Sequence, residues 1–180
     1  NDCIAFMFDS DNNLIRNLTI IDNDHDRESC GIGFYIPGPG VAHVAPNNNI
    51  IEKNKILEAG IGILVSSTNS YEFASNNIIR LNEVGGENNS LISLGIHVGK
   101  SEHDIIEKNI VNGITNTYPE LYHARGISLY LTRNARVCNN IISKVKSSIN
   151  QGSIGILLAG DSGRRGVQNL VYNNMICNIE

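Results

Sequence analysis

Tryptophan is absent from the 180 residues, proline occurs only 4 times, and aromatic residues make up 6% of the chain. Charged residues are also few, at 18%, where an average soluble domain has about a quarter. Hydrophobic residues nevertheless reach 41%, which is enough for one domain with its own core. Isoleucine, asparagine and glycine are abundant instead, and this composition favours strands and tight turns over helices.

No apolar run approaches the roughly 18 residues that a membrane-spanning helix needs, so we expect no membrane span. The net charge of −4 gives no general attraction to nucleic acid, and we expect no nucleic-acid partner. The 4 cysteines lack the C-x-x-C spacing of metal sites. Cys3 and Cys30 stand about one repeat apart, which leaves a disulfide open, but four small buried or half-buried side chains are the favoured interpretation.

One pattern recurs along the chain, and it is anchored on an asparagine. An aliphatic residue stands three positions before each anchor, and another follows two positions after every anchor but the first, where Ile20 takes the role in place of Thr19. The residues five positions before the anchors are Asn12, Asn49, Asn77, Asp104, Ala135 and Asn169. The anchors are Asn17, Asn54, Asn82, Asn109, Asn140 and Asn174, and they lie 27 to 37 residues apart.

A second strand-like segment precedes each of these copies. Apolar residues alternate in it with small or polar ones, which is the periodicity of a strand. Because both segments recur together, the sequence predicts a solenoid with one copy of each in every coil. The segments are Cys3-Ile4-Ala5-Phe6, Gly31-Ile32-Gly33-Phe34, Gly60-Ile61-Gly62-Ile63, Gly95-Ile96-His97-Val98, Gly126-Ile127-Ser128-Leu129 and Gly155-Ile156-Leu157-Leu158.

A single coil buries only a few aliphatic side chains, which cannot offset the conformational entropy lost when the chain orders. Stacked coils join these side chains into one continuous core, and each strand pairs with its copy in the next coil. We therefore predict an all-β fold, a right-handed single-stranded parallel β-helix of about six coils. It spans residues 1–180 as one domain, and because neither end carries a polar cap we expect a fragment of a longer chain.

The paired segments resemble the repeats of the pectate-lyase-like superfamily of parallel β-helix proteins, and the resemblance covers nearly the whole chain. That superfamily includes polysaccharide lyases, glycoside hydrolases, epimerases, phage tailspikes and surface adhesins. The resemblance implies a secreted, extracellular or cell-surface protein that binds a polysaccharide or oligosaccharide and cleaves or modifies it. The alternative is a non-enzymatic structural or adhesive solenoid, such as a tailspike or surface-protein shaft, and a homotrimer in solution would favour that alternative.

The insertions between repeats cluster on both sides of the Gly-Ile segments, so we expect the functional face there. His97 is the one titratable side chain at the first outward position of these segments, and its expected neighbours Gly62 and Ser128 are small. Lyases and epimerases of uronates need a base and a cation for the sugar carboxylate. The candidate catalytic residues are His97, Lys100, Glu102 and Arg125, and the candidate substrate-binding residues are Tyr35, Tyr122, His123, Tyr130 and Arg133.

The densest acidic segment covers residues 22–28. Its alternating carboxylates suit Ca²⁺, which prefers several oxygen ligands, and Asp22, Asp24 and Asp26 are the candidate ligands. The segment lacks the glycine and the distal glutamate of an EF-hand loop, so a solvated charged turn is the alternative.

Overall fold

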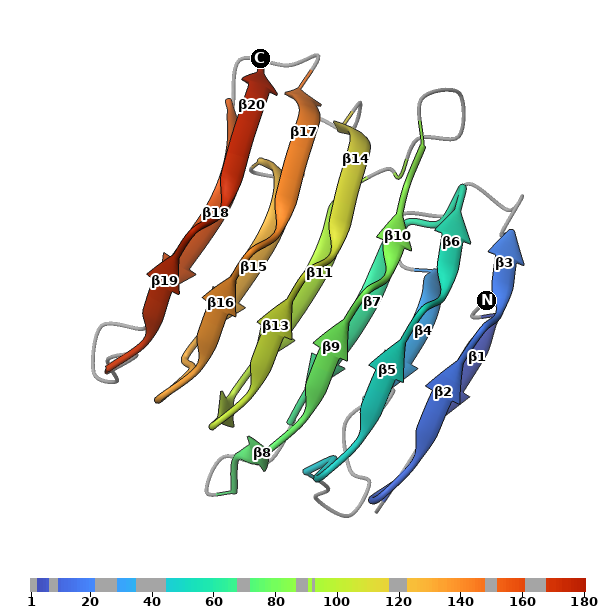
Figure 1. Ribbon diagram of the computed structural model, residues 1–180, viewed down its shortest axis with the longest axis vertical. Coiled ribbons are helices and arrows are strands. Elements are labelled where there is room, and N and C mark those ends of the chain that lie inside the picture. The colour runs from blue at the N-terminus through green and yellow to red at the C-terminus, as the bar shows by residue number, and fades with distance from the viewer. Residues whose placement is uncertain are drawn as a thin grey trace.

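The computed structural model describes residues 3–6, 10–21, 29–34, 45–67, 72–86, 91, 93–116, 123–147, 152–160 and 168–180. All the regular elements within these ranges are strands, and none of the described residues forms a helix that could cross a membrane. Figure 1 shows the strands stacked from the N-terminal coil at one end of the molecule to the C-terminal coil at the other.

The strands form three long parallel sheets of six strands each, which we number by the order in which the chain visits them. Sheet 1 contains the Gly-Ile segments: β1 (Ile4–Phe6), β4 (Cys30–Phe34), β7 (Ile61–Ser66), β11 (Leu94–Gly99), β15 (Ala124–Tyr130) and β18 (Ser153–Ala159). Sheet 2 contains β2 (Leu14–Arg16), β5 (Ile50–Glu52), β9 (Ile78–Arg80), β13 (Ile105–Glu107), β16 (Arg136–Cys138) and β19 (Leu170–Tyr172). Sheet 3 contains β3 (Thr19–Ile21), β6 (Lys55–Leu57), β10 (Glu83–Val84), β14 (Ile110–Asn116), β17 (Ile141–Ser147) and β20 (Met175–Ile179).

Each strand pairs with its copy in the next coil, as β4 pairs with β1 on one side and with β7 on the other. A short sheet of β8 (Ala74–Ser75) and β12 (Ser101–Glu102) lies at the corner between sheets 1 and 2. This arrangement is a parallel β-helix, so the predicted fold class is confirmed.

The core consists of columns of β-branched and leucine side chains that stack from coil to coil. Sheet 1 contributes Ile32, Ile63, Ile96 and Ile127, sheet 2 contributes Ile51, Ile79, Ile106 and Val137, and sheet 3 contributes Ile56, Val84, Val111 and Ile142, all of them fully buried. Full burial of one such side chain stabilises the fold by about 1.5–3 kcal/mol, so the columns supply its main driving force. In the last coil, Val171 and Ile176 continue two of these columns but are 42% and 47% exposed.

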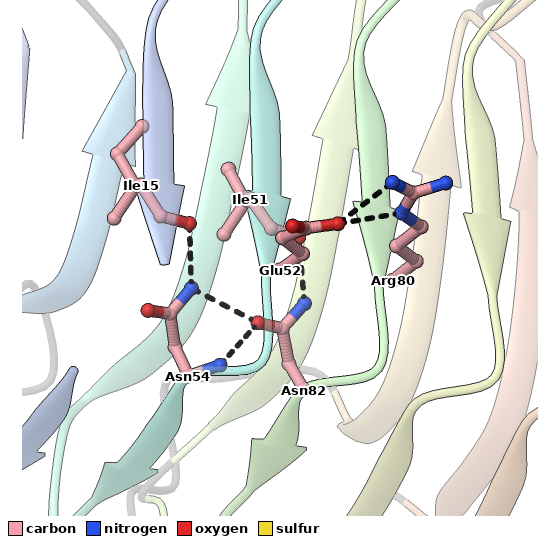
Figure 2. Close-up of polar contacts among 6 residues, drawn as sticks. All are labelled: Ile15, Ile51, Glu52, Asn54, Arg80 and Asn82. Atoms are coloured by element: carbon pink, nitrogen blue, oxygen red, sulfur yellow. Dashed lines mark hydrogen bonds and ion pairs between the residues drawn. The ribbon is translucent and has the colours of Figure 1, made fainter. Parts of the chain in front are cut away.

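Two ladders of buried asparagines bracket sheet 2, one at each end of its strands. In Figure 2, the backbone N and the side-chain Nδ2 of Asn54 both donate to Asn82 Oδ1, at 3.0 and 3.1 Å. Asn54 Nδ2 also donates to Ile15 O at 3.0 Å, and Asn82 Nδ2 donates to Ile51 O at 2.9 Å. Each amide therefore satisfies buried main-chain groups as well as the next amide, which is why asparagine recurs at these corners.

The residue before each ladder position has a positive φ, for example Asn48 at 56° and Lys53 at 55°. This left-handed conformation turns the chain from one sheet to the next, and asparagine tolerates it better than most residues. On the outer side of sheet 2, Arg80 pairs with Glu52, with 2.7 Å between Nη2 and Oε2.

The first copy of the repeat lies one residue later than predicted. Leu18 N donates to Asn54 Oδ1 at 3.1 Å, so Leu18 holds the anchor position, while Asn17 is the left-handed corner residue with φ 58°. Asn13, rather than Asn12, begins the other ladder, with 2.9 Å from its N to Asn49 Oδ1. Asparagine is favoured at the corner and at the ladder position alike, so the sequence signal could not separate them.

The third Gly-Ile copy also lies two residues later than predicted. Ile63, not Ile61, pairs with Ile32 and Ile96, so Gly62 takes the position expected for Gly60. A Cβ on Gly62 would overlap Val84 of sheet 3 and lie 2.5 Å from Gly95 O, so only glycine fits there. Both Gly60 and Gly62 are followed by an isoleucine, so the Gly-Ile pattern alone could not distinguish the two positions.

The disulfide between Cys3 and Cys30, which the sequence left open as the less favoured interpretation, is not formed. All four cysteines are present as thiols, with Cys30 and Cys138 buried and Cys3 and Cys177 exposed. The backbone N of Cys3 donates to Cys30 O at 3.1 Å, so a main-chain hydrogen bond joins the two coils at this point.

Candidate functional site

The outer face of β11 and β15 brings together the polar side chains expected to function. Along β11 the side chains of Ile96 and Val98 enter the core, so the side chain of His97 lies on the outer face. Ser128 of β15 is in register with His97 on one side, and Leu64 of β7 is in register with it on the other. The prediction that Gly62 lies beside His97 was therefore wrong, and Leu64 lies where open space was predicted.

Gly99 explains how the imidazole of His97 can lie close to the sheet. A Cβ on Gly99 would come within 3.2 Å of His97 Nε2 and 2.8 Å of Ser66 Oγ, so the ring extends along its own strand over the glycine. His97 Nδ1 is buried and has no hydrogen-bond partner among the described residues. Burial, followed by the positive charge of Arg125, lowers the pKa of His97 from 6.5 to about 4, so the ring is neutral at neutral pH.

Two further buried polar atoms lie on the neighbouring strand. Arg125 Nε and Ser128 Oγ, both of β15, also have no hydrogen-bond partner in the described part of the chain. Burial lowers the pKa of Arg125, but arginine keeps its charge because its ordinary pKa lies so high. The face thus presents a neutral imidazole, a hydroxyl and a cation, and buried groups of this kind are nearly always paired in folded proteins.

His123 and Tyr130 lie at the two ends of this face. His123 directly precedes β15, and its Nδ1, again buried and without a described partner, lies 3.9 Å from the point where a Cβ on Gly152 would stand. Tyr130 is in register with Gly99 and is 38% exposed, so its ring is the accessible aromatic surface of these two strands.

Lys100, Glu102 and Arg133 lie at the corner that follows this face. Lys100 is in the left-handed region with φ 44°, and its N donates to Tyr130 O at 2.8 Å. Glu102 lies in β12 and forms a parallel bridge with Arg133, whose guanidinium stands 4.2 Å from the centre of the Phe73 ring. The structure thus places His97 and Arg125 together on the sheet, and Lys100 and Glu102 together at the corner.

Five of the candidate residues lie outside the described ranges: Tyr35 and Tyr122 of the expected binding surface, and Asp22, Asp24 and Asp26 of the expected Ca²⁺ site. Among the residues that the structure does describe, no group of three or more His, Cys, Asp or Glu side chains could hold a metal ion.

A hollow of about 270 Å³ lies beside the last coil, lined by Leu158, Ala159, Gly160, Gln168 and Asn169. It borders the C-terminal edge of sheets 1 and 2 and does not include His97 or Arg125. The face of β11 and β15 is therefore a polar surface that a ligand would lie across, and the hollow is a separate feature.

The candidate residues predicted from the sequence did not include Asp104, a buried carboxyl group. Asp104 is fully buried in the ladder that begins at Asn13, where Asn49, Asn77 and Asn169 have amide side chains. Burial raises its pKa from 3.8 to about 6. The sequence did contain an indication of this residue, because Asp104 is the one acidic residue among the six that stand five positions before the anchors.

Comparison of the chain with known protein families, with curated proteins and with solved structures gave no match.

Proposed function

We propose that the protein binds an extracellular polysaccharide across the outer face of β11 and β15 and modifies it by proton transfer. The observation that carries the proposal is the set of buried polar atoms without a described partner on that face, His97 Nδ1, Ser128 Oγ and Arg125 Nε. A hydroxylated ligand offers both donors and acceptors, which suits a face built from an imidazole, a hydroxyl and a guanidinium. Tyr130 adds exposed aromatic surface of the kind that packs against a sugar ring.

The charges on this face favour an acidic sugar. His97 is neutral and can accept a proton, but a base with a pKa of about 4 is weak at neutral pH. A sugar carboxylate at Arg125 would offset the positive charge that lowers the pKa of His97, so the base would strengthen when the substrate binds. A lyase or an epimerase of uronates needs this combination of base and cation.

Glycoside hydrolysis has less support, because it uses two carboxyl groups. Neither β11 nor β15 contains Asp or Glu, and the nearest candidate along the chain, Glu102, lies at the corner beyond. The likeness of the repeats to the pectate-lyase-like superfamily supports both the polysaccharide and the extracellular location.

Polysaccharide arrays and depolymerisation assays, with and without Ca²⁺, test the proposal. We expect Arg125→Ala to weaken binding roughly tenfold, since hydrogen bonds to charged groups contribute about 1.5–3 kcal/mol. We expect Tyr130→Ala to weaken binding roughly tenfold as well, because the aromatic surface that packs against a sugar ring is lost. Tyr172→Ala is the matched control, because Tyr172 is 42% exposed and lies on sheet 2, away from the site. The proposal fails if no polysaccharide binds, or if the variants at Tyr130 and Tyr172 weaken binding equally.

A structural shaft is the second candidate function, and a separate observation favours it. Ile110, Ile141 and Met175 are in register on the outer face of sheet 3 and are 46%, 41% and 61% exposed. An exposed apolar stripe of this kind suits contact with other chains. Sedimentation of the purified protein tests this function: a trimer that binds no polysaccharide supports it, and a monomer counts against it.

A further inference from the structure

Asp104 takes the place of an asparagine in the ladder that begins at Asn13 and continues through Asn49 and Asn77. Its Oδ1 accepts from Asn77 N at 2.9 Å and from Asn77 Nδ2 at 3.1 Å, as an asparagine Oδ1 does at the other positions. Its Oδ2 therefore takes the place of the amide nitrogen, and this buried oxygen has no hydrogen-bond partner among the described residues. The next position of the ladder is Ala135, which offers no side-chain partner.

The other amides of this ladder show what the Oδ2 position normally does. Asn77 Nδ2 donates to Pro46 O at 3.0 Å, and Asn169 Nδ2 donates to Thr132 O at 3.2 Å. Each acceptor lies three residues before the ladder residue of the preceding coil. For Asp104 the ladder residue of the preceding coil is Asn77, so the corresponding acceptor is Ala74 O. An ionised Oδ2 cannot bond to Ala74 O, because it has no proton to donate.

Ser101 occupies the acceptor instead. Its hydroxyl donates to Ala74 O at 2.9 Å. The Ser101 side chain also acts on the Asp104 carboxyl, whose pKa it lowers against the larger effect of burial. A hydroxyl has one proton and can donate it to one of these acceptors at a time. The choice depends on whether Asp104 carries a proton of its own.

We propose that Asp104, Ser101 and the Ala74 carbonyl form a proton-operated latch at the corner between sheets 1 and 2. With a proton on Oδ2, the carboxyl group donates to Ala74 O as the asparagine amides do, and the corner is joined to the preceding coil. When the proton leaves for solvent, the Ser101 hydroxyl turns to the carboxylate and the bond to Ala74 O is lost. The corner that moves carries Lys100 and Glu102.

Few titratable groups in the described part of the chain surround Asp104, so its own protonation controls the latch. His103 is the titratable neighbour whose charge acts on the carboxyl, and it lowers the pKa against the larger effect of burial. Asn77 faces Asp104 from the preceding coil and Ala135 from the following one, and neither side chain titrates. Of the charged residues beside Ala135, Arg133 stacks on Phe73, and Arg136 donates its backbone N to Asp104 O at 2.8 Å.

Carbon-detected NMR of the Asp104 carboxyl, with amide hydrogen exchange at the corner, tests the latch on the intact chain. We expect the carboxyl to titrate near pH 6. Protection of the Asn76 and His103 amides, which bond across coils at this corner, falls roughly tenfold per pH unit between the ordinary pKa of Asp104 and its raised value. In Asp104→Asn this protection stays constant over the same range.

Ser101→Ala separates the latch from simple burial. Loss of the hydroxyl that stabilises the carboxylate raises the pKa of Asp104 above that of the unaltered protein. Ser93→Ala is the matched control, because Ser93 is also buried and its hydroxyl donates to Gly60 O one coil away at 2.9 Å. The proposal is overturned if Asp104 titrates at or below pH 4, or if Ser101→Ala and Ser93→Ala leave its pKa equally unchanged.

Discussion

Asp104→Asn is the substitution whose effect on stability can be worked out furthest from the structure. The folded pKa of about 6 lies above the ordinary value of 3.8, so the folded state binds this proton more tightly than the unfolded state. The stabilisation is therefore fully present below pH 3.8 and is lost as the pH rises to about 6. The difference corresponds to roughly 3 kcal/mol in the free energy of unfolding.

The contribution of His97 to the free energy of unfolding changes with pH in the opposite direction to that of Asp104, over nearly the same range of pH. Its folded pKa of about 4 lies below the ordinary 6.5, so its contribution is present above pH 6.5 and is lost as the pH falls to about 4. The magnitude is again roughly 3 kcal/mol. Because the two effects oppose each other, we expect the stability of the unaltered protein to change little between pH 4 and 6.

Urea denaturation followed by circular dichroism, repeated from pH 4 to pH 8, measures both effects. Asp104→Asn should raise the free energy of unfolding by about 3 kcal/mol at pH 7.5 and by little at pH 4. The stability of this variant should therefore rise with pH, because only the effect of His97 remains. The stability of His97→Gln should instead fall as the pH rises, because only the effect of Asp104 remains. Glu83→Gln removes a half-exposed carboxylate that pairs with Lys55 and serves as the control. If Asp104→Asn has the same dependence of stability on pH as the unaltered protein, burial of the Asp104 carboxylate does not destabilise the fold.

Three further predictions concern the ladders and the glycines. Asn109→Ala should cost about 3 kcal/mol in the free energy of unfolding by urea, because it leaves two buried main-chain groups of the preceding coil, Asn82 N and Ile79 O, without their side-chain partner. Gly62→Ala should cost about 2 kcal/mol in the same assay, because its Cβ would press on Gly95 O and neither backbone can move far. Gly99→Ala should displace the His97 ring toward solvent and raise its pKa toward 6.5, as measured by NMR of the ring protons. Unchanged stability in the first two variants, or an unchanged pKa in the third, would contradict the packing described.

The repeat was readable from the sequence because its physical causes act at fixed positions. The aliphatic columns and the ladder from Asn54 to Asn174 stand where the spacing placed them, and Ile20 takes the core position predicted for it. Each of these residues meets a requirement of its own, either burial of an apolar side chain or satisfaction of a buried backbone group.

The errors arose where two positions accept the same residue type. Asn12 and Asn17 fit a left-handed corner as well as a ladder, and Gly60 and Gly62 are each followed by an isoleucine. The second error mattered for the site, because it replaced an open space beside His97 with Leu64. Packing between sheets decides such cases, and it cannot be read from a single strand.

The candidate site was predictable in part. The sequence singled out His97 and Arg125, which the structure places on neighbouring strands with their charges in reach of one another. It gave no indication that Gly99 lets the imidazole lie on the sheet, or that Ser128 Oγ is buried without a described partner. Those facts depend on side-chain direction, which the alternating pattern does not specify.

The most direct test of the central claim is to map a bound ligand onto the protein. A uronate-containing oligosaccharide, taken from whichever polysaccharide the array retains, should be titrated into isotope-labelled protein while backbone and histidine-ring signals are recorded. We expect the largest shifts on His97, Arg125, Ser128 and Tyr130, and we expect the pKa of His97 to rise when the acidic sugar binds. Shifts concentrated on sheet 3 or around the hollow at Leu158, with His97 unmoved, would contradict that claim.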